Sequence, residues 1–344
     1  MNVSAAATGT TCAGCGTEIA PTLLSCPGCR RLVHAAALTD LAARAETAAA
    51  DGDLQAALAT WRSSLELLPP DSRQSASVAQ KIASLSQVVE AAGAAPAEVP
   101  TSGWWKWLAA LGPAGLLIWK FKFLVVALLT KGKLLLLGLT KAGTLASMFA
   151  SVGLYWTQWG LWFALGLVIS IYVHEMGHVA AIRRYGIAAS APMFIPGFGA
   201  LIRLKQAPVT PRESARIGLA GPVWGLAAAV AAAIAGRLGG WPMLLAIAHT
   251  GAWINLLNLA PVWQLDGSRA FASLTRPHRW IATAVLALSW MVTRDGMVLL
   301  VLLVAVGRTV GSRADAPPDR GALALFVFVA VALAVLCRLT QVVG

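Results

Sequence analysis

Long apolar stretches, separated by short polar segments, fill the second half of the chain. Several of them run close to twenty residues, the length that an α-helix needs to cross a lipid bilayer. They predict six candidate membrane spans, at residues 159–182, 217–235, 241–260, 280–292, 296–306 and 322–339. The two short spans, 280–292 and 296–306, can form a single hairpin. We therefore expect a mainly α, polytopic membrane protein that ends, in 311–344, with a cytoplasmic loop and a final span.

The first hundred residues are more polar and are typical of a soluble region. Apolar positions at helical spacing predict helices over 38–50 and 54–68, separated by Asp51-Gly52-Asp53. A third helix from about 75 to 92 would cover this pair. The layout of 38–92 resembles a tetratricopeptide repeat, although a plain helical hairpin fits equally well. Residues 93–103, rich in Gly, Ala, Pro, Glu and Ser, are expected to form a linker.

Residues 104–150 mix tryptophans, lysines and leucines. This mixture predicts a helix that lies in the membrane interface with its lysines near anionic lipid headgroups, followed by one span. A first span at 134–150 is the alternative. Nucleic-acid binding does not fit, because so many leucines surround the lysines.

The composition supports a membrane protein, with 58% hydrophobic and only 12% charged residues. The net charge of +12 could suggest nucleic acid, but the basic residues gather in three regions between the predicted spans, whereas the loop near Arg237 is nearly bare. This alternation follows the positive-inside rule and places the three basic regions in the cytoplasm. No charged start followed by an apolar segment is visible. We therefore expect a multi-pass protein of the cell membrane with a cytoplasmic N-terminal region and no nucleic-acid partner.

Four cysteines in 10–33 form two Cys-x-x-Cys pairs, Cys12 with Cys15 and Cys26 with Cys29. Two such pairs suit a tetrahedral site in which four thiolates hold a structural zinc ion. Two disulfides are the alternative, which a reducing cytoplasm disfavours. The segment resembles a zinc ribbon, a fold used more for contacts than for chemistry. Together with the following helices, residues 10–92 could bind a cytoplasmic protein partner.

A His-Glu-x-x-His motif, His174 to His178, lies at the end of the apolar run 161–173. Residues four apart on a helix face the same side, so both imidazoles can bind one metal ion. Glu175 lies beside them, where it can take a proton from water. Ionisable groups within a membrane segment are costly and usually mark function. Two core histidines on a helix are the alternative.

A second motif runs from Asn258 through Pro261 to Leu265-Asp266-Gly267. With the His-Glu-x-x-His motif it resembles the site-2 protease family of intramembrane zinc metalloproteases, over a core of about 151–310. Asp266 then supplies the third ligand to a catalytic zinc ion beside His174 and His178, unless it is an ordinary turn residue. The resemblance also implies that Asn258 positions substrate or stabilises the oxyanion. A helix C-cap before Pro261 is the alternative for Asn258.

Between the two motifs, the glycines and prolines of 194–204 exclude a regular helix, and 200–204 could form a short strand. The resemblance implies a short re-entrant β element beside the metal, whose free edge pairs with an unwound substrate. A plain cytoplasmic loop is the alternative. The predicted substrate-binding residues are Gly197, Gly199, Ala200, Leu201 and Ile202.

The segment Gly221-Pro222-Val223-Trp224-Gly225 resembles a Gly-Pro-x-x-Asn element of that family. Gly225 stands where Asn is common, so the polar contact of that Asn is expected to be absent. His249, in the middle of a predicted span, is expected to be a hydrogen-bonded packing residue.

These features predict an intramembrane zinc endopeptidase that hydrolyses peptide bonds in or near the transmembrane segments of other membrane proteins. Glu175 would be the general base, with one catalytic and one structural zinc ion bound. One alternative is a non-proteolytic membrane adaptor that recruits a partner through 10–92. A zinc hydrolase acting on lipids or small molecules would use the same ligands.

Overall fold

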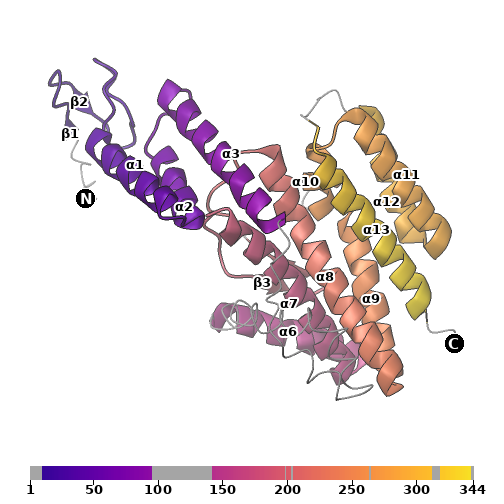
Figure 1. Cartoon of the computed structure of the whole chain (residues 1–344). Helices are drawn as coiled ribbons and strands as arrows, with labels where there is room; N and C mark the ends of the chain where they lie inside the picture. Colours follow the sequence, from indigo (N-terminus) through magenta and orange to yellow (C-terminus); the bar gives the residue numbers. More distant parts are fainter. Residues whose placement is uncertain are drawn as a thin grey trace, which may run out of the picture. The chain divides into compact units, whose positions relative to one another are not determined.

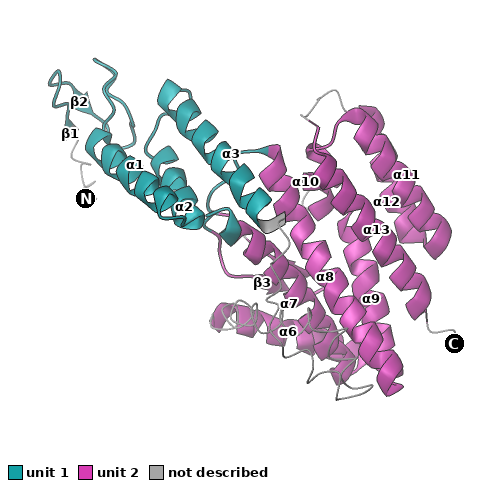
Figure 2. Ribbon diagram, viewed as in Figure 1, with its two compact units in different colours: residues 1–95, 183–188, 205–210 teal, residues 96–182, 189–204, 211–344 magenta. Residues whose placement is uncertain are grey.

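The structure is a computed structural model that describes residues 10–94, 142–197, 199–202, 204–262, 265–311 and 318–341. The chain forms two compact units (Figure 2): the first holds 1–95, 183–188 and 205–210, and the second holds 96–182, 189–204 and 211–344. Helices dominate both, and the described residues contain two short two-stranded sheets. The predicted interfacial helix with its lipid-facing lysines, and most of the predicted linker, lie outside the described residues.

The first unit begins with a small β hairpin and continues with three helices (Figure 1). Strand β1 (Thr10–Thr11) pairs antiparallel with β2 (Glu18–Ile19). The helices are α1 (Ala35–Ala50), α2 (Leu54–Leu65) and α3 (Arg73–Ala94). Asp53 caps α2 by accepting a hydrogen bond from the Ala56 backbone N–H at 3.0 Å, which satisfies a donor that the helix start leaves free. Apolar side chains at helical spacing, among them Leu58, Trp61 and Ile82, form the core.

Two short segments from later in the chain complete this first unit. Residues 183–188 follow the His-Glu-x-x-His motif, and 205–210 precede the next helix. Val209 packs against the core of the three helices. The buried Arg62 donates from Nε to the backbone oxygen of Tyr185 at 2.8 Å, and Gln206 Nε2 donates to Glu66 Oε1 at 2.6 Å. The N-terminal helices therefore hold both of these segments.

The second unit starts with helix α6 (Ala142–Trp159), which Gly160, at φ 84°, separates from α7 (Leu161–Arg184). After α7, strand β3 (Met193–Ile195) pairs antiparallel with β4 (Gly199–Leu201), with Phe194 opposite Ala200. Buried Val168, Tyr172 and Met176 of α7 pack against Phe194 of β3. Apolar residues of α6 join the same cluster, so α6, α7 and the β hairpin share one core.

The remaining helices are α8 (Pro211–Gly239), α9 (Pro242–Asn258), α10 (Asp266–Ala272), α11 (Arg276–Thr293), α12 (Gly296–Gly311) and α13 (Arg320–Thr340). Helix α13 packs against α8, α9 and α11, and α8 packs against α9 and the short α10 (Figure 1). The expected hairpin between α11 and α12 is present, with Arg294 in the left-handed conformation at φ 54°. His249 is a packing residue, as expected, with its Nδ1 3.0 Å from the backbone oxygen of Cys337.

Three helices in the described part of the chain are long and apolar enough to cross a bilayer: α7, α8 and α13. They match three of the six predicted spans. The other three correspond to shorter or less apolar helices, α9, α11 and α12. The protein is therefore a mainly α, polytopic membrane protein, which confirms the expected fold class.

Candidate metal centres

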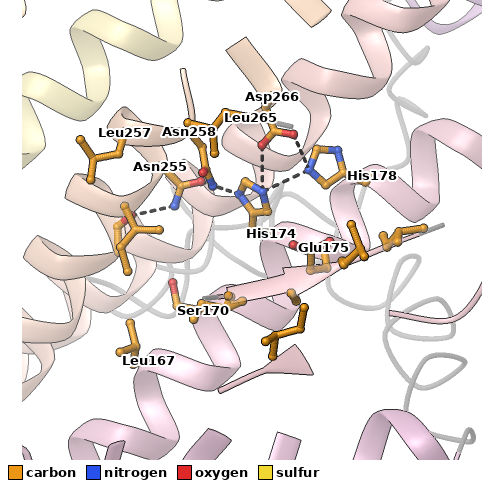
Figure 3. A pocket seen from close by; sticks show the side chains of 18 of the residues that line it. Leu167, Ser170, His174, Glu175, His178, Asn255, Leu257, Asn258, Leu265 and Asp266 are labelled. Carbon is orange, nitrogen blue, oxygen red and sulfur yellow. Dashed lines mark hydrogen bonds and ion pairs between the residues drawn. The ribbon is translucent and has the colours of Figure 1, made fainter. Parts of the chain in front are cut away.

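Helix α7 brings the two histidines of the motif together. His174 and His178 lie one turn apart, are buried, and have their Nε2 atoms 3.1 Å from one another. Glu175, also buried, lies beside them on the same helix. Figure 3 shows the three side chains with the two imidazoles turned toward a common point.

Asp266, the first residue of α10, faces both imidazoles (Figure 3). Its Oδ2 lies 3.1 Å from His174 Nε2, and its Oδ1 lies 3.1 Å from His178 Nε2. The packing of α10 against α8 holds the carboxylate in this place. The three residues predicted as ligands are thus close enough to hold one metal ion.

The donor set fits zinc. Ligand atoms about 2.0–2.1 Å from a tetrahedral ion lie about 3.3 Å from one another, close to the 3.1 Å separations found here. Two nitrogens and one oxygen from the protein leave a fourth position open, as in catalytic rather than structural zinc sites.

The other nitrogen of each ring faces an oxygen. His174 Nδ1 lies 2.7 Å from Asn255 Oδ1, and His178 Nδ1 lies 2.7 Å from the backbone oxygen of Ile217. A carbonyl oxygen only accepts, so each Nδ1 carries a hydrogen, which leaves Nε2 as the nitrogen that can bind a metal when the ring is neutral. Both Nε2 atoms face the Asp266 carboxylate, so a cation between them can contact all three ligand atoms.

Gly221 on α8 leaves space at the same point. A Cβ on this residue would lie 2.2 Å from His178 Nε2 and 2.6 Å from His174 Nε2. In the sequence, Gly221 is recognisable only as part of a Gly-Pro element, and Asn255 belongs to neither motif. The only signal for Asn255 in the sequence is an amide within an otherwise apolar helix.

The triad lines a cavity of about 990 Å³ in the second unit. The residues predicted to bind substrate all line it: Gly197, Gly199, Ala200, Leu201 and Ile202. Strand β4 begins one residue before the expected strand at 200–204 and ends at Leu201. Asn258 also lines the cavity and is the last residue of α9, whose C-cap is Leu259.

A second cluster lies in the first unit, where the four cysteine sulfurs are within 4.8 Å of one another. Cys12 Sγ is 3.6 Å from Cys29 Sγ, and Cys15 Sγ is 3.5 Å from Cys26 Sγ. Four sulfurs about 2.3 Å from a tetrahedral zinc ion would lie about 3.8 Å apart, close to these values. The thiols are free rather than joined as disulfides.

The backbone repeats one conformation around both cysteine pairs. The residue after each pair is left-handed, Gly16 at φ 74° and Arg30 at φ 60°. Thr17 lies 3.2 Å from Cys15 Sγ, and this hydrogen bond lowers the pKa of the Cys15 thiol to about 6. The fold therefore favours a thiolate at Cys15, the form that binds zinc.

Comparison with known proteins agrees with this geometry. Residues 162–240 match the profile of Peptidase family M50. Zinc metalloprotease MJ0392 of Methanocaldococcus jannaschii is 26% identical over 136 residues, which are 38% of this chain and 39% of that protein. Rip3 of Mycobacterium tuberculosis, also named as a zinc metalloprotease, is 32% identical over 163 residues, 44% of this chain and 40% of its own. No solved structure matches the chain significantly.

The chain thus spans about two fifths of the length of the curated relatives that it matches. The matched region contains nearly all of α7, with its two histidines, and all of α8, which supplies Gly221. The resemblance to the site-2 protease family is confirmed as a resemblance: residues 162–240 match the profile of Peptidase family M50, and two zinc metalloproteases are similar to part of the chain.

Proposed function

We propose that the protein is an intramembrane zinc endopeptidase that hydrolyses peptide bonds in or near the transmembrane segments of other membrane proteins. The observation that carries this proposal is the convergence of His174, His178 and Asp266 beside a cavity in a helical membrane protein. The similarity to named zinc metalloproteases supports the same chemistry.

His174, His178 and Asp266 would hold the catalytic zinc ion, which supplies a Lewis acid for the scissile carbonyl and lowers the pKa of water. Glu175, buried beside the two histidines, is the general base in this proposal. It takes a proton from the attacking water and passes it to the leaving amine. Asn258, at the end of α9 and on the cavity wall, would donate its amide hydrogen to the developing oxyanion.

Strand β4 is the proposed substrate edge. A peptide bond in an intact helix is shielded, so a substrate must unwind before cleavage. An extended segment paired with β4 would keep its backbone hydrogen bonds in the membrane. The exposed side chains of Met193, Ile195 and Leu201 would give this hairpin an apolar surface suited to such a substrate.

We place the protein in the cell membrane with its first unit in the cytoplasm, on the basis of the basic inter-span regions. The four cysteines would hold a structural zinc ion, supported by their sulfur spacing. This zinc would add folding energy to a segment whose own core, formed around Cys12, Ile19 and Cys26, is small. Residues 10–92 are then available to bind a cytoplasmic protein partner.

Replacing Glu175 by Gln tests the proposal. This variant should keep two zinc ions per chain and lose cleavage, because the amide cannot take a proton. New N-termini within apolar segments, mapped by mass spectrometry in native membranes, should appear with the wild type and not with Glu175→Gln. A His174→Ala control should lose one zinc ion and cleavage together. Cleavage by Glu175→Gln at the wild-type rate would refute the assigned role.

A further inference from the structure

Gly225 of α8 and Asn255 of α9 occupy a single space between their helices. A Cβ on Gly225 would lie 2.1 Å from Asn255 Oδ1 and 2.4 Å from Asn255 Nδ2. Heavy atoms cannot approach this closely, so the amide of Asn255 fits only because residue 225 has no side chain. Gly225 is the position where the Gly-Pro-x-x-Asn pattern has Asn. An amide is therefore present at this place, but α9 supplies it.

The amide of Asn255 is buried and fixed in orientation. Its Nδ2 donates to the backbone oxygen of Gly251 at 2.7 Å, and its Oδ1 is 2.7 Å from His174 Nδ1. Turning the amide over would place its NH₂ group toward the ring nitrogen and its oxygen toward another oxygen. The bond to Gly251 therefore keeps Oδ1 as the acceptor, and His174 keeps its hydrogen on Nδ1.

This hydrogen bond acts on the ligating side of the ring. With the hydrogen on Nδ1, His174 Nε2 is free to bind a metal, and it lies 3.1 Å from Asp266 Oδ2. The bond also prevents rotation of the ring away from Asp266. Partners of this kind usually change metal affinity by about 10- to 100-fold when they are removed.

We propose that Asn255 is a positioning residue that fixes His174 for zinc binding, and that residues 225 and 255 are alternative sources for one amide at this place. Either helix can supply the amide, but only when the facing residue is small. A side chain that starts 2.1 Å from the atom that His174 contacts can bring its own amide oxygen to the same nitrogen. The inference rests on the proposed zinc site at His174, His178 and Asp266.

The experiment compares zinc affinity in full-length Asn255→Ala, Gly225→Asn and the double variant Gly225→Asn/Asn255→Ala. Competition with a chelator measures the affinity. Cobalt(II) identifies the site, because its visible absorption differs between four thiolates and a histidine and carboxylate set. Asn255→Ala should weaken the His174 site by about 10- to 100-fold and leave the cysteine site unchanged. Gly225→Asn should weaken the His174 site as well, because two side chains would compete for one space.

The double variant should bind zinc at least tenfold more tightly than either single variant. Asn255→Leu keeps the approximate shape without an acceptor and should behave like Asn255→Ala, which separates the hydrogen bond from packing. Wild-type zinc affinity in Asn255→Ala, or a double variant no better than the weaker single variant, would overturn the inference. Absence of metal from the His174 site of the wild type would instead refute the proposed function.

Discussion

At the scale of single residues, each histidine of α7 has a polar partner at both of its ring nitrogens. Each Nε2 faces Asp266 and each Nδ1 faces an oxygen acceptor, so ring rotation and tautomer are both determined. In a membrane segment, two imidazoles and a carboxylate this close together are costly unless a positive charge balances the carboxylate. A bound cation is the simplest arrangement that makes this cluster stable.

Gly221→Ala should remove zinc from this centre. The new Cβ would lie 2.2 Å from His178 Nε2, within the space that the ion needs. We expect the purified protein to fall from two zinc ions per chain to one, as measured by elemental analysis. Gly153→Ala on α6 is the matched control, because a Cβ there meets nothing within 4 Å. Two zinc ions in Gly221→Ala would show that the metal lies elsewhere.

The rate of alkylation of Cys15 should depend on pH, and Thr17 should set the pH of the midpoint. The hydrogen bond to Thr17 lowers the pKa of the thiol to about 6, so the reactive thiolate is present above pH 6 and is lost as the pH falls through 6. In metal-free protein, Thr17→Val should move this midpoint upward. Iodoacetamide labelling of Cys15, followed by peptide mass spectrometry, measures it. Thr22→Val, in the same exposed segment, should leave the midpoint unchanged.

The sequence was sufficient to predict which residues come together in the two candidate metal centres, because local spacing and motif order determine them. His174 and His178 share a helix face through their separation alone. Gly221 and Asn255 could not be predicted in the same way, because their roles depend on how closely α8 and α9 approach α7. A glycine and an asparagine in apolar helices carry no signal for that distance.

At the scale of elements, Asp319 joins two of the predicted membrane helices. It is buried, caps α13 by accepting from the Ala322 N–H at 2.9 Å, and lies 3.4 Å from Arg216 of α8. The cap and the ion pair are separate contributions to stability. The sequence predicted both helices but not the ion pair between them, because residues 216 and 319 are far apart in the chain.

Asp319→Ala should destabilise the second unit more than Asp319→Asn. Alanine removes both the cap, worth about 1 kcal/mol, and the ion pair, worth about 1 kcal/mol beside a partly exposed arginine. Asparagine keeps the cap and loses only the charge. Thermal unfolding in detergent should show a midpoint several degrees lower for Ala and about half that decrease for Asn. Equal midpoints for the two variants would mean that the cap at Asp319 does not contribute to stability.

The β element was predicted less well than the helices. Glycine and proline excluded a helix in 194–204, but the partner strand, Met193–Ile195, could not be identified from the sequence. Short strands are specified by their pairing and by packing partners more than by their own residues. Here Phe194 packs against Tyr172 and Met176 of α7, a contact that only the folded chain reveals.

At the scale of the whole molecule, the N-terminal helices are not an isolated module. Their unit includes 183–188 and 205–210, the two segments that flank the stretch 189–204 with strands β3 and β4. Bonds such as Arg62 to Tyr185 span more than a hundred residues of sequence, so the periodicity that predicted the helices could not predict this association. The first unit thus includes the residues that precede and follow the stretch 189–204 in the sequence.

Arg62→Ala should make the segments 183–188 and 205–210 open more often. Loss of a hydrogen bond from a charged donor costs about 1.5–3 kcal/mol, which corresponds to local opening about 10- to 100-fold more frequent. Hydrogen exchange should therefore accelerate in 183–188 and 205–210, while peptides from α9 and α13 keep their rates. Arg44→Ala is the matched control, because Arg44 lies on the exposed face of α1 and pairs only weakly with Asp40. Unchanged exchange in both segments of Arg62→Ala would mean that this hydrogen bond does not hold them to the N-terminal helices.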